Sequence, residues 1–529
     1  MLNRRRAAAL AALVWVAAGC SVGDDDIEHW KHTQRGPRKI TTVLVEARYP
    51  QPLRVHAARA LIEMRHPNAN GLELLATAMQ AMAATEREPV VHALLPELQQ
   101  MMSAPAAAPA PGAAATEGPS EPQIKAKDAG YVLLRGDGHS SFASTEDRAA
   151  LATLILDWVL ADFNHRALAG SFTAEQIVNA VGPTAAERLT RALTADDAAI
   201  PVAVEISRLI NLVGTPQGKQ GAVAQLVRDA QEISGAGATE RLRGRARTLL
   251  SSGPRAVDEA RLSAAAEQLR TQYLTLLFEA IRSLQQPNGA EYLLTVARTP
   301  TAPIERRRAS LAAMAGNVSA ANIPALFEIV DGCPANAPPT TGPQCDVDLR
   351  GLAVDRLGET RSRDVIPRLF GLFDQANGVA ADQSFTVRWK LGEAIIRLGG
   401  NAVIGEFAEH LGRPRGAPFA GFTFAELNGE SQALGDIAPP PRAALRVRAT
   451  PNNPQPVRLL AMMFLGIKGE AGDVALLQSY AAETTAVVGE GWGDQQMTTV
   501  GAVATRSRDN LQQALRSAAQ AANGAAPQP

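Results

Sequence analysis

The stretch RASLAAMAG (308–316) occurs in related form twice more in the second half of the chain, as RGLAVDRLG (350–358) and RLLAMMFLG (458–466). Each copy begins with an arginine, continues with small or apolar residues at helical spacing and closes on a glycine. A second apolar segment follows each copy, at 323–327, 365–370 and 474–477. This pattern predicts pairs of helices, and repetition of one such unit predicts an array in which neighbouring pairs stack.

Two further segments extend the pattern. VRWKLGEA begins at Val387, closes at the glycines 399–400 and precedes another helical segment at 403–411, and LRVHAARAL (53–61) is an N-terminal echo. These segments resemble the HEAT repeat, which implies an all-α fold, an α-solenoid of HEAT-like helix pairs. The physical reason is general, because one pair cannot bury its apolar stripe alone whereas stacked pairs share a continuous core.

Amphipathic helical patterns also cover much of the first half of the chain. They form one block at 51–103 and a longer middle region at 129–285. Within the middle region, a short apolar run at 131–134 is expected to be a strand and not part of a helix. The alternation of strands and helices that marks a parallel-sheet enzyme is not evident, so that class is disfavoured. Whether the middle region continues the solenoid or folds separately is left open by the pattern.

The first twenty residues are typical of a secreted, lipid-modified protein. Three arginines (4–6) precede an apolar run (7–18), and AAGC (17–20) resembles the lipobox of bacterial lipoproteins. The resemblance implies that Cys20 becomes the N-terminus of the mature protein and carries three acyl chains, which would anchor it stably in a membrane. An ordinary signal with a chance cysteine and a short membrane anchor are the alternatives, although the apolar run is too short to span. By the sorting tendency of the lipoproteins that this segment resembles, Ser21 after the cysteine implies the outer membrane of the cell envelope, facing the periplasm or the surface.

The predicted organisation follows from these patterns and from changes of composition. The segments are a lipoprotein signal peptide (1–19), a lipidated tether (20–50), an N-terminal HEAT-like block (51–103), an Ala/Pro-rich linker (104–128), the middle helical region (129–285), HEAT-like repeats (286–412), an irregular insertion (413–456), C-terminal HEAT-like repeats (457–520) and a disordered tail (521–529).

The remaining cysteines, Cys333 and Cys345, lie in one Pro-rich loop. In an oxidising compartment such a pair predicts a disulfide. A metal or redox role is the alternative, but the spacing is not Cys-x-x-Cys and no histidine lies nearby.

Composition and motifs exclude several classes of function. A net charge of -1 and an aromatic content of 4% give little material for a nucleic-acid surface. The segment 214–220 has glycines and a lysine like a phosphate loop, but it lacks the final Ser or Thr and follows a helix. His29 and His32 could share a helix face with a metal, but a solvated tether explains them better. We therefore predict no cofactor, no metal and no small-molecule substrate.

Two sets of residues remain as candidates for partner contact or scaffold stability. The early arginines of the repeats, Arg54, Arg308, Arg350, Arg388 and Arg458, are expected to pair with carboxylates of neighbouring units. Aromatics in irregular segments are our candidates for binding a protein partner, because aromatics anchor interfaces, although they could instead cover the end of the solenoid. These aromatics are Phe419, Phe422, Phe424 and Trp492.

The sequence therefore predicts a lipid-anchored, non-catalytic envelope scaffold that binds an unknown protein partner. The alternatives are an enzyme or enzyme-accessory protein with a site in the middle region (129–285), and a purely structural spacer.

Overall fold

The computed structural model describes residues 22–104, 118–251, 258–332, 346–376, 381–414 and 421–524. All regular elements within these ranges are helices, apart from two isolated bridges between single residues, so the expected all-α fold is confirmed. The strand expected at 131–134 is wrong, since these residues lie in a helix. The chain divides into two compact units, Met1–Gln225 and Leu226–Pro529.

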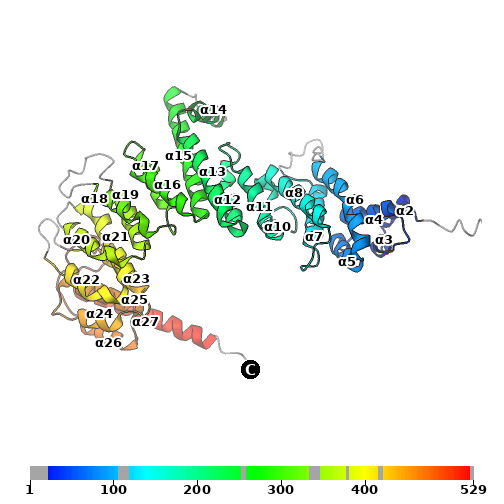
Figure 1. Ribbon diagram of the computed structural model, residues 1–529. Coiled ribbons are helices and arrows are strands. Elements are labelled where there is room, and N and C mark those ends of the chain that lie inside the picture. The colour runs from blue at the N-terminus through cyan, green and yellow to red at the C-terminus, as the bar shows by residue number, and fades with distance from the viewer. Residues whose placement is uncertain are drawn as a thin grey trace, which may run out of the picture. The chain divides into compact units, whose positions relative to one another are not determined.

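The first unit is a bundle of helix pairs (Figure 1). Its helices are α2 (Asp24–Trp30), α3 (Gly36–Val45), α4 (Gln51–Glu63), α5 (Gly71–Ala81), α6 (Ala84–Ser103), α7 (Glu121–Arg135), α8 (Thr145–Ala161), α9 (Phe163–Arg166), α10 (Ala174–Val181), α11 (Thr184–Ala192), η1 (Ile200–Val202) and α12 (Ala203–Val213), and α13 (Pro216–Ser234) crosses into the second unit. Successive pairs pack on one another, as in the contacts of α4 with α6, α6 with α8 and α10 with α12.

The second unit is a two-layered stack of helices. Its elements are α14 (Ala238–Ser251), α15 (Glu259–Ser283), α16 (Pro287–Arg298), α17 (Ile304–Ala313), η2 (Ala320–Asn322), α18 (Ile323–Asp331), α19 (Val347–Glu359), η4 (Arg363–Val365), α20 (Ile366–Ala376), α21 (Ala381–Gly399), η5 (Gly400–Val403), α22 (Ile404–Leu411), α23 (Phe424–Gly435), α24 (Arg442–Arg448), α25 (Gln455–Lys468), α26 (Ala471–Ser479) and α27 (Val500–Gly524). The odd-numbered helices from α15 to α27 contact one another in succession and form one continuous layer. Apolar side chains such as Leu311, Leu357 and Phe464 are fully buried in this layer, which is the shared core that stacked pairs require.

The expected tether (20–50) is wrong for most of its length. Residues 24–30 and 36–45 form α2 and α3, and Ile27, Ile40 and Leu44 are fully buried. Three aspartates occupy the first turn of α2, where negative charge offsets the helix dipole. The N-terminal helical block therefore begins before residue 51.

The expected linker and insertion also differ from the structure. Although residues 105–117 lie outside the described ranges, α6 and α7 on either side pack together, so the linker separates no units. The insertion (413–456) contains α23 and α24, and α23 fills the layer between α21 and α25. A capping box starts α23, in which the Glu426 amide donates to Thr423 Oγ1 and the Thr423 amide donates to the Glu426 carboxylate. At the C-terminus, α27 continues past residue 520 into the expected tail.

A buried or half-buried arginine recurs at the fourth residue of one helix in each of four pairs. Its Nε donates to a carbonyl at the end of the preceding helix, which satisfies an acceptor that has no partner within that helix. The bonds are Arg54 to Leu44 (2.9 Å), Arg307 to Ala297 (2.8 Å), Arg350 to Val330 (2.9 Å) and Arg458 to Ala449 (3.4 Å). The structural equivalent of Arg54, Arg350 and Arg458 is thus Arg307, so the predicted alignment on Arg308 is wrong by one residue.

We expect Arg307→Leu to destabilise the second unit by about 1–3 kcal/mol, because the Ala297 carbonyl then loses its donor. The measurement is the free energy of unfolding of the full-length protein, with Arg298→Gln as control. Arg298 pairs with Glu328 on the surface, with 46% of its side chain exposed, and should change stability by less than about 1 kcal/mol. Equal effects of the two variants would contradict a structural role for the recurrent arginine.

Candidate functional site

The structure places the predicted site residues in two groups. Cys20, Cys333, Cys345 and Phe419 lie outside the described ranges, so lipidation and the disulfide stay predictions. Phe422, Phe424 and Trp492 lie in the second unit, at the start of α23 and in the segment that leads to α27.

Trp492 connects that segment to the start of α23 through contacts with Phe422 and Phe424. Phe422 and Trp492 are each only 2% exposed, and Trp492 Nε1 donates to the Phe422 carbonyl at 2.9 Å. Phe424 meets the Trp492 ring edge to face, with centroids 5.5 Å apart. Two of the three rings are therefore engaged inside the unit, which fits the alternative that they cover the stack, and only the half-buried Phe424 is within reach of a partner.

The expected ion pairs between neighbouring repeats are present for four of the five predicted arginines. Arg308 of α17 pairs with Asp346, the N-cap of α19, and Arg388 of α21 pairs with Glu426 of α23. Arg458 of α25 holds both oxygens of Glu483 at 2.9 and 2.6 Å, and Arg54 lies 3.6 Å from Glu86. Arg350 instead donates to a backbone carbonyl. The contacts of Arg308 and Arg388 connect successive helices of the layer in the second unit, Arg54 connects α4 with α6 in the first unit, and Arg458 connects α25 with the segment that leads to α27.

These pairs predict an acid-sensitive stack. Burial works to raise the pKa of Asp346, but the bonds from Arg308 and the Leu349 amide, with the charges of Arg308 and Arg307, together lower this pKa below the ordinary 3.8. The bond from Arg458 lowers the pKa of Glu483 below 4.5. Because the folded pKa values are depressed, the stabilisation is complete above the unfolded values and is lost as pH falls through the folded ones. We expect a melting temperature that is steady from about pH 7 to 5.5 and falls below about pH 4.5. In Arg308→Gln the fall should be smaller, and an unchanged acid profile would contradict the link.

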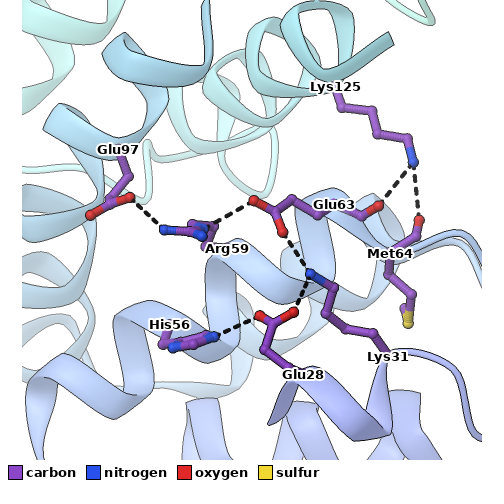
Figure 2. A network of polar contacts seen from close by, with 8 residues as sticks. All are labelled: Glu28, Lys31, His56, Arg59, Glu63, Met64, Glu97 and Lys125. Atoms are coloured by element: carbon purple, nitrogen blue, oxygen red, sulfur yellow. Dashed lines mark hydrogen bonds and ion pairs between the residues drawn. The ribbon is translucent and has the colours of Figure 1, made fainter. Parts of the chain in front are cut away.

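A second set of charges joins α2, α4, α6 and α7 in the first unit, and Figure 2 shows how they alternate in sign. Lys31 contacts Glu28 at 2.8 Å and Glu63 at 2.7 Å, and Arg59 joins Glu63 to Glu97 with two contacts of 3.0 Å. At the ends of this chain of contacts, His56 meets Glu28, and Lys125 donates to the carbonyls of Glu63 and Met64.

This network holds helices together, and its central Lys31–Glu28 pair is not adjusted for proton transfer. Burial opposes both charges, yet the mutual bonds raise the pKa of Lys31 and lower that of Glu28, away from neutrality in both cases. A general acid or base needs the opposite adjustment. Among the described residues, no cluster of three or more His, Cys, Asp or Glu side chains could hold a metal ion. The described helices include none with the length and apolar content to cross a membrane.

Hollows of 650–740 Å³ lie on both units. One lies beside α3 and is lined by residues that include Thr41, Thr42 and His66. Another lies between α6, α7 and α8, where the Arg166 guanidinium stacks 4.7 Å from the Trp158 ring.

One hollow on the described part of the second unit is distinguished by its arginines. About 710 Å³ in volume, it lies where α17, α19 and α21 end; we call it the arginine hollow. Its lining residues are Gly316, Val318, Gly358, Glu359, Thr360, Arg361, Arg363, Arg397 and Leu398. Arg361, Arg363 and Arg397 are exposed and make no ion pair with any described residue. Sequence reasoning missed them because they come from two separate turns of the stack; the only signal was an arginine where related helix ends have glycine.

The geometry defines the protein as an α-solenoid of helix pairs. The chain matches no family model and no curated protein. Among solved structures, the crystal structure of Kap121p is similar over 88% of this chain and 44% of that chain, with 12% identity and a TM-score of 0.35. An engineered protein is similar over 90% of this chain and 98% of that chain, with 15% identity and a TM-score of 0.22. The present chain thus spans under half the length of Kap121p, and the solenoid assignment rests on its own helix packing.

Proposed function

We propose that this protein is a lipid-anchored scaffold of the bacterial cell envelope that binds a protein partner through its stacked helix pairs and performs no catalysis. The observation that carries the proposal is the continuous layer from α15 to α27, in which buried or half-buried ion pairs join α17 to α19 and α21 to α23. Such a layer offers an extended surface whose geometry is fixed before binding, which reduces the entropy that binding must overcome.

The location follows from the lipobox resemblance of residues 17–20. An acylated Cys20 holds the protein at the outer membrane, facing the periplasm or the cell surface, and the helix pairs are then presented to proteins of that compartment. A helical body held at a membrane by its N-terminus is suited to assembling or positioning another protein.

An enzyme site in the middle region has less support from the geometry. The ionisable groups nearest to the hollow between α6, α7 and α8 are engaged, since Arg188 holds both oxygens of Asp157 and Arg166 stacks on Trp158. A catalytic site needs a nucleophile or acid–base pair within hydrogen-bond reach of a substrate.

The test is capture of the partner from detergent-solubilised envelope with tagged full-length protein, after brief crosslinking. We expect one protein to be enriched in stoichiometric amount, and the spacer alternative predicts that none is. Capture should be lost when excess untagged protein is added as competitor. Enrichment that survives the competitor is nonspecific and would count against the scaffold.

A further inference from the structure

The arginine hollow has a backbone that favours glycine where the chain has arginine. The helices α17 and α21 are followed by Gly316 and Gly400 at φ of 75° and 56°, whereas the equivalent left-handed position after α19 is Arg361 at φ 57°. A side chain in this conformation costs free energy that glycine does not. The chain therefore carries a charged side chain at the hollow in place of the residue that would end the helix most stably.

Gly358 has no side chain, and this allows a second arginine to reach the same hollow. A Cβ added to Gly358 would lie 3.3 Å from Ala394 Cβ and 3.4 Å from Arg397 Nη1, so glycine allows α21 to approach α19 closely. Arg397 then lies beside the end of α19, on the hollow that Arg361 and Arg363 also line.

The charge of the hollow exceeds what the helix ends require. Cations at helix C-termini offset the helix dipole, which accounts for about one arginine at each end. The end of α19 has Arg361 and Arg363 in addition to Arg356, which is only 7% exposed and is paired with Glu359 at 3.1 Å. Burial lowers the pKa of Arg356. The negative charges of Glu359 and Asp355 act to raise this pKa, whereas the nearby positive charges of Arg282 and Arg397 lower it further. Positive charge is thus concentrated here beyond what Glu359 balances.

We propose that the arginine hollow binds an acidic segment of the protein partner, with carboxylates held by Arg361, Arg363 and Arg397. The planar guanidinium group matches a carboxylate with two parallel hydrogen bonds. A peptide also brings backbone N–H donors, which suit the carbonyl-rich helix ends here, where the Leu357 carbonyl already accepts from Thr360 and the Ala312 carbonyl from Arg356. Inorganic phosphate has mostly acceptors and brings few donors for these carbonyls, so it fits the helix ends less well than a peptide does. This inference rests on the proposed scaffold function and specifies the chemistry of the partner.

The test uses the full-length protein in detergent and a fluorescein-labelled peptide of alternating glutamate and alanine, followed by fluorescence anisotropy at low salt. We expect the peptide to bind, its glutamine counterpart not to bind, and the affinity to fall with added salt. Arg361→Gly should weaken binding about tenfold, because it removes charge-assisted hydrogen bonds. The same variant should keep or raise the melting temperature, since glycine suits the left-handed backbone. Loss of binding without loss of stability is not expected of a merely structural arginine.

The matched control replaces Arg245 and Arg247, two exposed arginines of α14 in the same unit, with glutamine. This control should bind the peptide as the unchanged protein does. Equal binding by Arg361→Gly and the control, or displacement of the peptide by inorganic phosphate at an equal concentration of charge, would overturn the proposal. A partner captured equally by Arg361→Gly and the unchanged protein would remove the hollow from the interface and leave the scaffold intact, whereas capture of no partner would remove the scaffold function itself.

Discussion

Replacing Cys20 with alanine is expected to abolish attachment of the protein to the membrane. Burial of an acyl chain contributes about 0.8 kcal/mol per methylene, so that one chain binds reversibly and two or more hold a protein stably. Under the lipobox resemblance all of these chains depend on Cys20, and the variant should lose them together. The measurement is incorporation of radioactive palmitate, with partition of the protein into the detergent phase as a second readout.

Cys333→Ser is the control for this experiment, because Cys333 is predicted to form a disulfide with Cys345 and not to be acylated. It should keep both the label and the detergent partition. Labelling of Cys20→Ala at the level of the unchanged protein would exclude the anchor and with it the proposed location.

Arg388→Met is expected to destabilise the second unit by about 3–5 kcal/mol, the usual loss when one partner of a buried ion pair is removed. Glu426 is fully buried and Arg388 is 4% exposed, so the variant leaves a charge inside the stack between α21 and α23. The guanidinium of Arg388 also lies 4.8 Å from the Phe422 ring, and this contact is lost as well. The measurement is the unfolding free energy, or the melting temperature by calorimetry.

A second variant separates loss of the ion pair from general damage. Replacing both Arg388 and Glu426 with methionine removes the uncompensated charge and should recover most of the lost stability, because apolar groups of similar volume often replace a buried pair at little cost. A single-variant loss below about 1 kcal/mol, the range of an exposed pair, would show that this contact does not join the helices as described.

The repeats could be predicted from the sequence because each copy encodes its own helix pair. Their register could not be predicted to the residue. Arg306, Arg307 and Arg308 are adjacent, and only the start of α17 at Ile304 decides that Arg307 reaches the Ala297 carbonyl while Arg308 reaches the next repeat. The apolar pattern leaves helix starts uncertain by about one turn, which is enough to exchange these roles.

Two helical segments were missed for identifiable reasons. The helix α2 spans only seven residues and buries only Ile27, which is too little to give a period. In α3 the buried residues Ile40, Val43 and Leu44 do recur at helical spacing, but the polar residues before Ile40 favour a tether. The start of α23 is marked in the sequence, because Thr423 and Glu426 form a capping box ahead of an apolar segment. The prolines and glycines around this segment nevertheless favour a loop. The arginine hollow could not be predicted at all, because its charges meet only once the turns after α19 and the end of α21 are stacked.

Hydrogen–deuterium exchange of the full-length protein, with and without its captured partner, tests most directly whether the stacked layer is the binding surface. We predict that the partner slows exchange in several successive elements of the second unit, including the turns that follow α17 and α19. Protection confined to the hollow between α6, α7 and α8, or no protection of the second unit, would contradict a scaffold that binds through its helix stack.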